Sequence, residues 1–121
     1  MKLYTSYFSK VRALPEGTVP ISISLWPPKG YAGAQLRCLA PTKEILTKYK
    51  QDGDWAAYVE KYEKDVLGKL RQETIMQEIT RLSGGKDAAI LCFERDPAQC
   101  HRSLVARWLR KAGYKIAEYG A

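Results

Sequence analysis

The sequence is poor in the residues that build most catalytic and metal centres, since its 121 residues include one histidine and three cysteines. An odd number of cysteines without framework spacing favours free thiols over a disulfide scaffold. No apolar run reaches the roughly 20 residues that a membrane-spanning helix needs. The chain opens with Met1 and Lys2 and has no apolar signal segment. We therefore expect a reduced, cytoplasmic protein with no membrane segment.

Several common catalytic motifs are missing as well. A phosphatase-type loop needs an arginine six residues after its cysteine, and Ala106 stands at that position after Cys100. Neither a Gly-rich phosphate loop nor the paired cysteines of the zinc deaminases are present. Cys92, Cys100 and His101 lack the usual zinc spacing and a fourth ligand. We expect no metal and no other cofactor.

Basic residues are abundant, and they are unevenly distributed. The formal net charge is +7. Lys and Arg outnumber acidic residues by five to one in residues 1–41 and by seven to four in residues 84–121, whereas residues 42–83 carry eight of each. Basic ends favour an anionic partner, either a phosphate-bearing small molecule or a nucleic acid. The charge is equally compatible with a basic protein that has no such partner.

The apolar patterning predicts a single α/β domain over residues 1–121. The hydrophobic content of 45% is enough for one core. Strands are indicated at 3–8, 19–25, 88–93 and 115–119, with helices between 42 and 83 and after 96. The continuous apolar run 88–93 is typical of a strand buried on both faces. This order predicts a three-layer, Rossmann-like sandwich around a small, mainly parallel sheet of about four strands.

Local signals predict the helix boundaries. Thr42 is a predicted N-cap for a helix that ends near Gly53, and an aromatic stripe predicts a core-packing helix of about four turns from residue 54. Thr74 and Gln77 predict a capping box for the next helix, and Asp96, before a proline, predicts the start of the last one. Residues 26–41, with three prolines and two glycines, are predicted to be an irregular loop.

The turn after the strand 88–93 carries the candidate chemistry. Ligands of parallel sheets bind beyond the carboxyl ends of the strands, and this turn holds Glu94 and the tripeptide Cys100, His101 and Arg102. Helical spacing turns Cys100 and His101 inward, toward the crevice. The helix N-terminus and the Arg102 charge favour a thiolate at Cys100. The same N-terminus also suits a bound anion, with Arg102 as a bidentate clamp.

We predict that Cys100, His101 and Glu94 supply the catalytic groups. Predicted substrate or anion contacts are Arg102, Lys10, Trp26, Lys29, Tyr31 and Arg37. Structural roles remain open for single residues. Cys92 has the character of a small buried hydrophobe, His101 could bind a carbonyl in the core, and Glu94 could pair with an arginine.

The spacing of these residues resembles the signature of a known family. Cys92, Glu94 and Pro97, followed by Cys100, His101 and Arg102, match the pattern C-x-E-x-x-P-x-x-C-H-R of the bacterial family called domain of unknown function 488. The resemblance is specific over the last third of the chain. It implies a Rossmann-like α/β fold and a Cys-His-Arg site, and it brings no settled reaction with it.

Three hypotheses for function follow. The leading one is a small enzyme acting on a nucleotide or nucleic-acid substrate, whose phosphate is held by Arg102, Lys29 and Arg37. The alternative is a non-catalytic nucleic-acid-binding or accessory module, in which Trp26 or Tyr31 stacks on bases. In the third, the Cys-His-Arg turn only braces the crevice.

Overall fold

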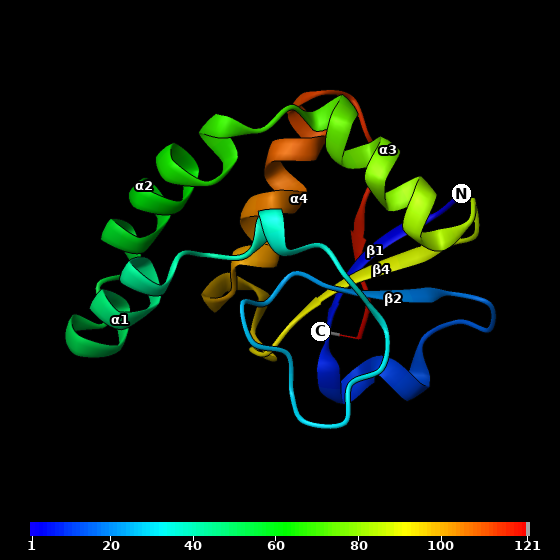
Figure 1. Ribbon diagram of the computed structural model, residues 1–121, viewed down its shortest axis with the longest axis horizontal. Coiled ribbons are helices and arrows are strands. Elements are labelled where there is room, and N and C mark those ends of the chain that lie inside the picture. The colour runs from blue at the N-terminus through cyan, green and yellow to red at the C-terminus, as the bar shows by residue number, and fades with distance from the viewer. Residues whose placement is uncertain (121) are drawn as a thin grey trace.

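The centre of the molecule is a five-stranded parallel sheet, in a computed structural model that describes residues 1–120 (Figure 1). The strands lie in the order β3-β2-β4-β1-β5, and the neighbouring pairs are parallel. The α/β class and the parallel sheet are confirmed. One strand more than expected is present, because β3 lies inside the segment predicted to be an irregular loop. The strands are β1 (Leu3–Tyr7), β2 (Val19–Ser22), β3 (Ala34–Gln35), β4 (Ala88–Cys92) and β5 (Ala117–Glu118).

Helices make up most of the connections between the strands. In Figure 1, α3 and α4 lie above the sheet, α1 and α2 lie to its left, and the 3-10 helix η1 (Phe8–Ala13) lies below it. Within residues 1–120, no helix is both long and apolar enough to cross a bilayer. The α-helices are α1 (Lys43–Asp52), α2 (Trp55–Asp65), α3 (Gln72–Ser83) and α4 (His101–Lys111), and three further 3-10 helices are η2 (Arg37–Leu39), η3 (Leu67–Lys69) and η4 (Pro97–Gln99).

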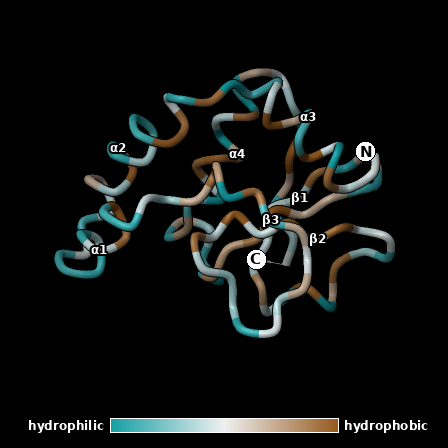
Figure 2. The backbone as a smooth tube through the Cα atoms, viewed as in Figure 1, coloured by the Kyte–Doolittle hydropathy of each residue, from teal (hydrophilic) through white to brown (hydrophobic). Residues whose placement is uncertain are grey.

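Strand β4 lies between β2 and β1, and all five of its residues are buried, as its apolar run predicts. Its Cys92 pairs with Tyr7 of β1, and its Ile90 pairs with both Thr5 of β1 and Ile21 of β2. One face of the strands forms a single core with the helices. Figure 2 shows hydrophobic residues frequent along the strands and α4 in the middle of the molecule. This central strand therefore carries Cys92 to a fixed place at its carboxyl end.

Several helix boundaries agree with the sequence prediction. The Thr42 hydroxyl accepts a hydrogen bond from the Ile45 N–H at 3.2 Å, so Thr42 is the N-cap of α1. Gly53 ends α1 in the left-handed conformation with φ of 62°, and Gly84 ends α3 in the same way with φ of 65°. Glycine adopts this conformation without the cost that a Cβ would add.

Two of the predicted boundaries are wrong. Helix α3 begins at Gln72 after Arg71, so Thr74 lies inside its first turn and caps nothing. Burial explains the shift, because Ile75 and Ile79 reach the core from this earlier start. Helix α2 spans 11 residues instead of about four turns, since the chain turns into η3 where Leu67 becomes buried. Tertiary packing outweighs local capping preference at both places.

The start of the last helix also differs from the prediction. Asp96 accepts a hydrogen bond from the Ala98 N–H at 3.0 Å, but it caps the short helix η4 and not α4. Helix α4 begins at His101, with Cys100 as its N-cap residue. Cys100 therefore lies at the junction of two helices and His101 in the first turn of α4.

The Thr42 cap supports a helix that lines the candidate site, and its contribution can be measured. Thr42→Ala should lower the free energy of unfolding by about 1 kcal/mol, because one N–H of the first turn loses its partner. Thr47→Ala is the matched control, because Thr47 is an exposed residue in the middle of α1. We expect this substitution to leave the free energy of unfolding unchanged or to raise it slightly, since alanine favours the helical conformation. Urea unfolding of both variants checks this, and equal effects would contradict the capping role.

Candidate functional site

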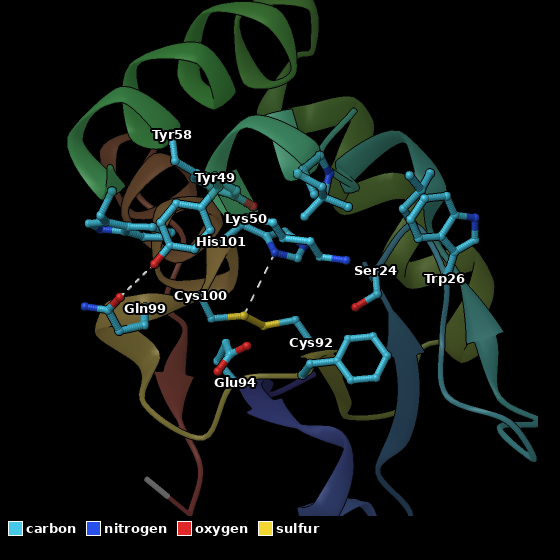
Figure 3. Close-up of a pocket in the computed structure, with 15 residues that line it drawn as sticks. Ser24, Trp26, Tyr49, Lys50, Tyr58, Cys92, Glu94, Gln99, Cys100 and His101 are labelled. Atoms are coloured by element: carbon cyan, nitrogen blue, oxygen red, sulfur yellow. Dashed lines mark hydrogen bonds between the residues drawn. A yellow bond between two sulfur atoms is a disulfide. The ribbon is translucent and has the colours of Figure 1, made fainter. Parts of the chain in front are cut away.

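A cavity of about 420 Å³ lies where β2 and β4 end. This is the edge of a parallel sheet at which ligands usually bind. One wall comes from residues 24–26 after β2, a second from residues 92–94 and 99–101 around β4 and the start of α4, and the third from α1 and α2. Of the predicted site residues, Cys100, His101, Glu94 and Trp26 line this cavity together (Figure 3).

Aromatic side chains form most of the apolar lining. Trp55 stacks on Tyr58 with 4.6 Å between ring centroids, and Tyr49 packs edge-on against both of them. On the opposite sides, Trp26 is 55% exposed and Phe93 is 52% exposed. Flat aromatic surfaces of this kind suit a planar ligand, because ring faces stack favourably on one another.

Two sulfur atoms lie at the floor of the cavity, and they are bonded to each other. Cys92 at the end of β4 and Cys100 before α4 form a disulfide, with their Cα atoms 6.9 Å apart (Figure 3). The expectation of three free thiols is therefore wrong for this pair. The seven residues between them fold back through η4, which brings the strand end and the helix start together. Cys38 remains a free, exposed thiol.

The single imidazole lies directly beside this disulfide. His101 is buried, and its Nε2 lies 2.7 Å from the Ile23 carbonyl oxygen. Because a carbonyl oxygen can only accept, Nε2 carries the proton and Nδ1 is unprotonated in the neutral ring. Nδ1 faces the Cys100 Sγ at 3.9 Å. His101 is therefore both a buried histidine bound to a carbonyl and a residue whose second ring nitrogen faces Cys100.

The surroundings of His101 keep the ring neutral. Burial is the main cause that lowers its pKa to about 4, and the nearby Arg102 charge acts in the same direction. The hydrogen bond to Ile23 opposes both effects in part. At neutral pH the imidazole is therefore a base with a free lone pair on Nδ1.

Arg102 is fully buried, and every donor of its guanidinium has a partner. Nε and Nη2 donate to the Glu118 carboxylate, each at 2.9 Å. Nη2 also donates to the Arg95 carbonyl at 3.0 Å, and Nη1 donates to the Glu94 carbonyl and to the Cys92 Sγ, the latter at 3.3 Å. A guanidinium has five N–H donors, and these contacts use all five. The arrangement therefore does not support Arg102 as an anion clamp.

The side chain of Glu94, unlike that of Arg102, is not held by any other residue that the structure describes. Its backbone carbonyl is held by Arg102, whereas its side chain is exposed and lines the cavity beside the disulfide (Figure 3). Within residues 1–120 its carboxylate forms neither a hydrogen bond nor an ion pair with another side chain, and Glu118 is the ion-pair partner of Arg102. Glu94 is free to contact a ligand.

Four predicted contact residues lie outside the cavity lining, namely Lys10, Lys29, Tyr31 and Arg37. The Tyr31 hydroxyl donates to the Ala34 carbonyl at 2.7 Å, and burial raises its pKa to about 12. Arg37 Nε donates to the Gln35 side chain at 3.1 Å. For Lys29, Tyr31 and Arg37 the reason is that the chain between Trp26 and Pro41 runs to β3 on the outer side of β2, whereas Lys10 lies in η1. Lys50 of α1 is the cation in the lining.

Sequence reasoning missed the wall that α1 and α2 contribute. The aromatic stripe of α2 is visible in the sequence and was assigned to core packing, which is right for the fully buried Tyr62. Trp55 and Tyr58 begin the same stripe and also line the cavity, as do Tyr49 and Gln99, whose side chains are joined by a hydrogen bond of 3.0 Å. The clustering of aromatic residues was the available signal, but the fold of α1 against α2 decides which of them face the cavity.

The two sulfurs and the imidazole also have the character of metal ligands. Their donor atoms lie within 4.8 Å of one another, and all three residues are buried. A histidine ligand usually donates its other ring N–H to a carbonyl or carboxylate, as His101 does to Ile23. Binding a metal would require both cysteines in the thiolate form, so a metal and the disulfide exclude each other.

The molecule has a small α/β fold with a parallel sheet, and a cysteine pair and a histidine lie at the carboxyl edge of that sheet. Residues 5–113 match the family model described as the active DUF488-N3 subclade. The chain therefore belongs to the DUF488 family, as its signature indicates. Neither a curated protein nor a solved structure gives a significant match.

The neutral state of His101 makes stability depend on pH. Between the unfolded pKa of 6.5 and the folded value of about 4, the unfolded chain binds a proton that the folded protein does not. Stability should therefore fall as the pH falls through this window, by about 3 kcal/mol in total. His101→Gln removes this loss. The difference in unfolding free energy between the two proteins, measured from pH 7 to pH 4, should change by that amount, and a constant difference would contradict the assignment.

The Arg102 network predicts a large cost of removal. Arg102→Met leaves a carboxylate and two carbonyls without their donor, and it should lower the unfolding free energy by about 3 kcal/mol. Arg107→Met is the matched control on the same helix, because Arg107 and its partner Glu63 are exposed. We expect that loss to stay below about 1 kcal/mol. Similar losses in chemical denaturation would show that Arg102 has no special role.

Proposed function

We propose that this protein is a small enzyme that acts on a nucleotide, either free or as a unit of a nucleic acid, with reduced Cys100 as its nucleophile. The observation that carries the proposal is the contact between the Cys100 Sγ and the unprotonated Nδ1 of His101, at the floor of an aromatic cavity. A thiol beside an oriented base is the arrangement that nucleophilic catalysis requires.

The size and lining of the cavity support a nucleobase as the bound group. Its volume of about 420 Å³ falls within the range of sites that bind small molecules. Trp26 is exposed and Trp55 is half-buried, and both line the cavity, so their rings are the candidates on which a base can stack. Stacking of this kind contributes about 1–3 kcal/mol per base.

His101, Cys100 and Glu94 divide the proposed chemistry among them. Nδ1 of His101 accepts the proton of the Cys100 thiol as the sulfur adds to an electrophilic carbon of the base, and the electron pair of the π bond that breaks there moves to the neighbouring ring atom. The Nε2–H bond to Ile23 keeps the ring in the tautomer that this transfer needs. The Glu94 carboxyl passes a proton from solvent to that ring atom, and the reverse steps restore the π bond and release Cys100.

The contacts to phosphate are reassigned in this proposal. Lys50 lines the cavity and is exposed, so it replaces Arg102 as the candidate partner of the nucleotide phosphate. Lys10, Lys29 and Arg37 lie outside the lining, which limits their proposed role to phosphates beyond the bound nucleotide. A net charge of +7 supports such additional contacts.

A second candidate function has one observation in its favour. Trp26 is 55% exposed at the cavity, which suits base stacking without any reaction. In a non-catalytic nucleic-acid-binding or accessory module, binding would weaken steeply with salt and would not depend on Cys100.

Turnover of the reduced protein tests the proposal. We would incubate it with a phosphine reductant and a panel of nucleosides, nucleotides and short DNA and RNA strands, and detect products by mass spectrometry. Cys100→Ser should lower turnover about 10³-fold or more while binding is retained, because the base of the substrate still stacks. Trp26→Ala should weaken binding by about tenfold.

The exposed Cys38 provides the matched control. Cys38→Ser should leave both turnover and binding unchanged, since this thiol lies outside the cavity. Full turnover by Cys100→Ser would overturn the proposal. Binding without turnover that weakens with salt and survives loss of Cys100 would favour the accessory module instead. No binding and no turnover across the panel would exclude both.

A further inference from the structure

We propose that Cys92 and Cys100 form a reversible dithiol–disulfide couple, which exchanges with small thiols that enter the cavity, by attack at Cys100 and departure at Cys92. This activity goes beyond the proposed function and does not depend on it. It rests on the different groups that surround the two sulfur atoms.

The surroundings of Cys92 favour a departing thiolate. Its Sγ accepts a hydrogen bond from Nη1 of Arg102 at 3.3 Å. A guanidinium keeps its charge at every physiological pH. Glu118 balances this charge, but its oxygens contact Nε and Nη2, so the N–H that points at the sulfur is free to stabilise negative charge there. A better stabilised thiolate leaves faster in thiol–disulfide exchange.

The surroundings of Cys100 favour an incoming thiol. Its Sγ lies 3.9 Å from Nδ1 of His101, which carries a free lone pair. A thiol that approaches Cys100 from the cavity can donate an S–H hydrogen bond to this nitrogen, which orients its sulfur toward Cys100. It attacks as the thiolate after its proton passes to solvent. The guanidinium of Arg102 donates to the Cys92 sulfur and not to the Cys100 sulfur, so the two sulfurs are chemically unequal.

The exchange proceeds in two steps. A first thiolate forms a bond to the Cys100 sulfur, the bond to Cys92 breaks, and Cys92 leaves as a thiolate paired with Arg102. A second thiolate attacks the outer sulfur of this mixed disulfide and releases Cys100. Overall, two small thiols lose two electrons and two protons and become one disulfide, and the protein gains a dithiol.

The cavity restricts which thiols can react. Both sulfurs line it, although Cys92 is only 1% exposed and Cys100 only 4% exposed. A bulky protein thiol would have to bring its cysteine past Trp26 and Phe93, whereas a small thiol of the size of glutathione can enter a volume of about 420 Å³. We therefore assign low-molecular-weight thiols and their disulfides as the reacting class.

Equilibration in glutathione buffers tests the couple. The Cys38→Ser protein is kept at a series of ratios of glutathione to its disulfide, then alkylated and weighed by mass spectrometry. We expect molecules with no label to give way to molecules with two labels as the buffer becomes more reducing. Two labels at every ratio would mean that no disulfide forms, and no label even in excess dithiothreitol would mean that it does not exchange. Either result overturns the proposal.

The chemical difference between the sulfurs is tested by locating the mixed disulfide that forms during reduction. The Cys38→Ser protein is reduced with glutathione, quenched with acid at early times and mapped by peptide mass spectrometry. We expect glutathione on Cys100 at least about tenfold more often than on Cys92, because Cys92 is the sulfur whose departing thiolate Arg102 stabilises. Equal occupancy, or more glutathione on Cys92, would contradict the assigned direction.

A zinc measurement separates this proposal from a metal centre. The reduced protein is mixed with zinc chloride, desalted and alkylated under native conditions. We expect the thiols to stay reactive and no zinc to be retained. One zinc ion per chain that protects Cys92 and Cys100 from alkylation would overturn the couple in favour of a metal site. None of these readouts uses turnover, so their failure is distinguishable from failure of the proposed enzyme activity.

Discussion

The structure of the site depends on one buried cation. The Arg102 guanidinium joins the end of β4, the turn that follows it and the Glu118 carboxylate of β5, and it does so from the first turn of α4. An unpartnered charge in this position would be costly, so the five contacts form together or not at all. Through them the strand end that carries Cys92 and the helix start that carries Cys100 are held against each other.

His101 forms a second link between elements at the same place, and it supplies the base beside Cys100. Its Nε2–H bond joins α4 to the segment after β2, and this bond orients the free Nδ1 toward Cys100. One sulfur therefore faces a neutral base and the other faces a cation. The aromatic walls from α1, α2 and residue 26 place an apolar cavity in front of them. The two sulfurs and the imidazole at its floor are buried, which strengthens the polar interactions between them.

The sequence predicts the sheet better than it predicts the site. The apolar run around Ile90 specifies a central parallel strand, because burial of that strand on both faces is a direct consequence of its composition. Capping at Thr42 is equally local, whereas Thr74 failed because burial of Ile75 moved the helix start. The signature indicates which residues form the site, but not what each of them contacts. The sequence suggests a ligand as the partner of Arg102, whereas the guanidinium binds the Glu118 carboxylate, which is distant in sequence, and two backbone carbonyls. The sequence does not predict the disulfide, because nothing in the seven intervening residues indicates that the chain folds back.

An unprotonated imidazole nitrogen that faces Cys100 is what gives this site its chemistry, and it can be measured directly because His101 is the only histidine of the sequence. A long-range ¹H–¹⁵N correlation spectrum of the reduced protein at neutral pH gives the protonation state of both ring nitrogens without an assignment problem. We expect a neutral ring with the proton on Nε2 and none on Nδ1. A proton on Nδ1, or a fully protonated ring, would show that His101 cannot accept a proton from Cys100.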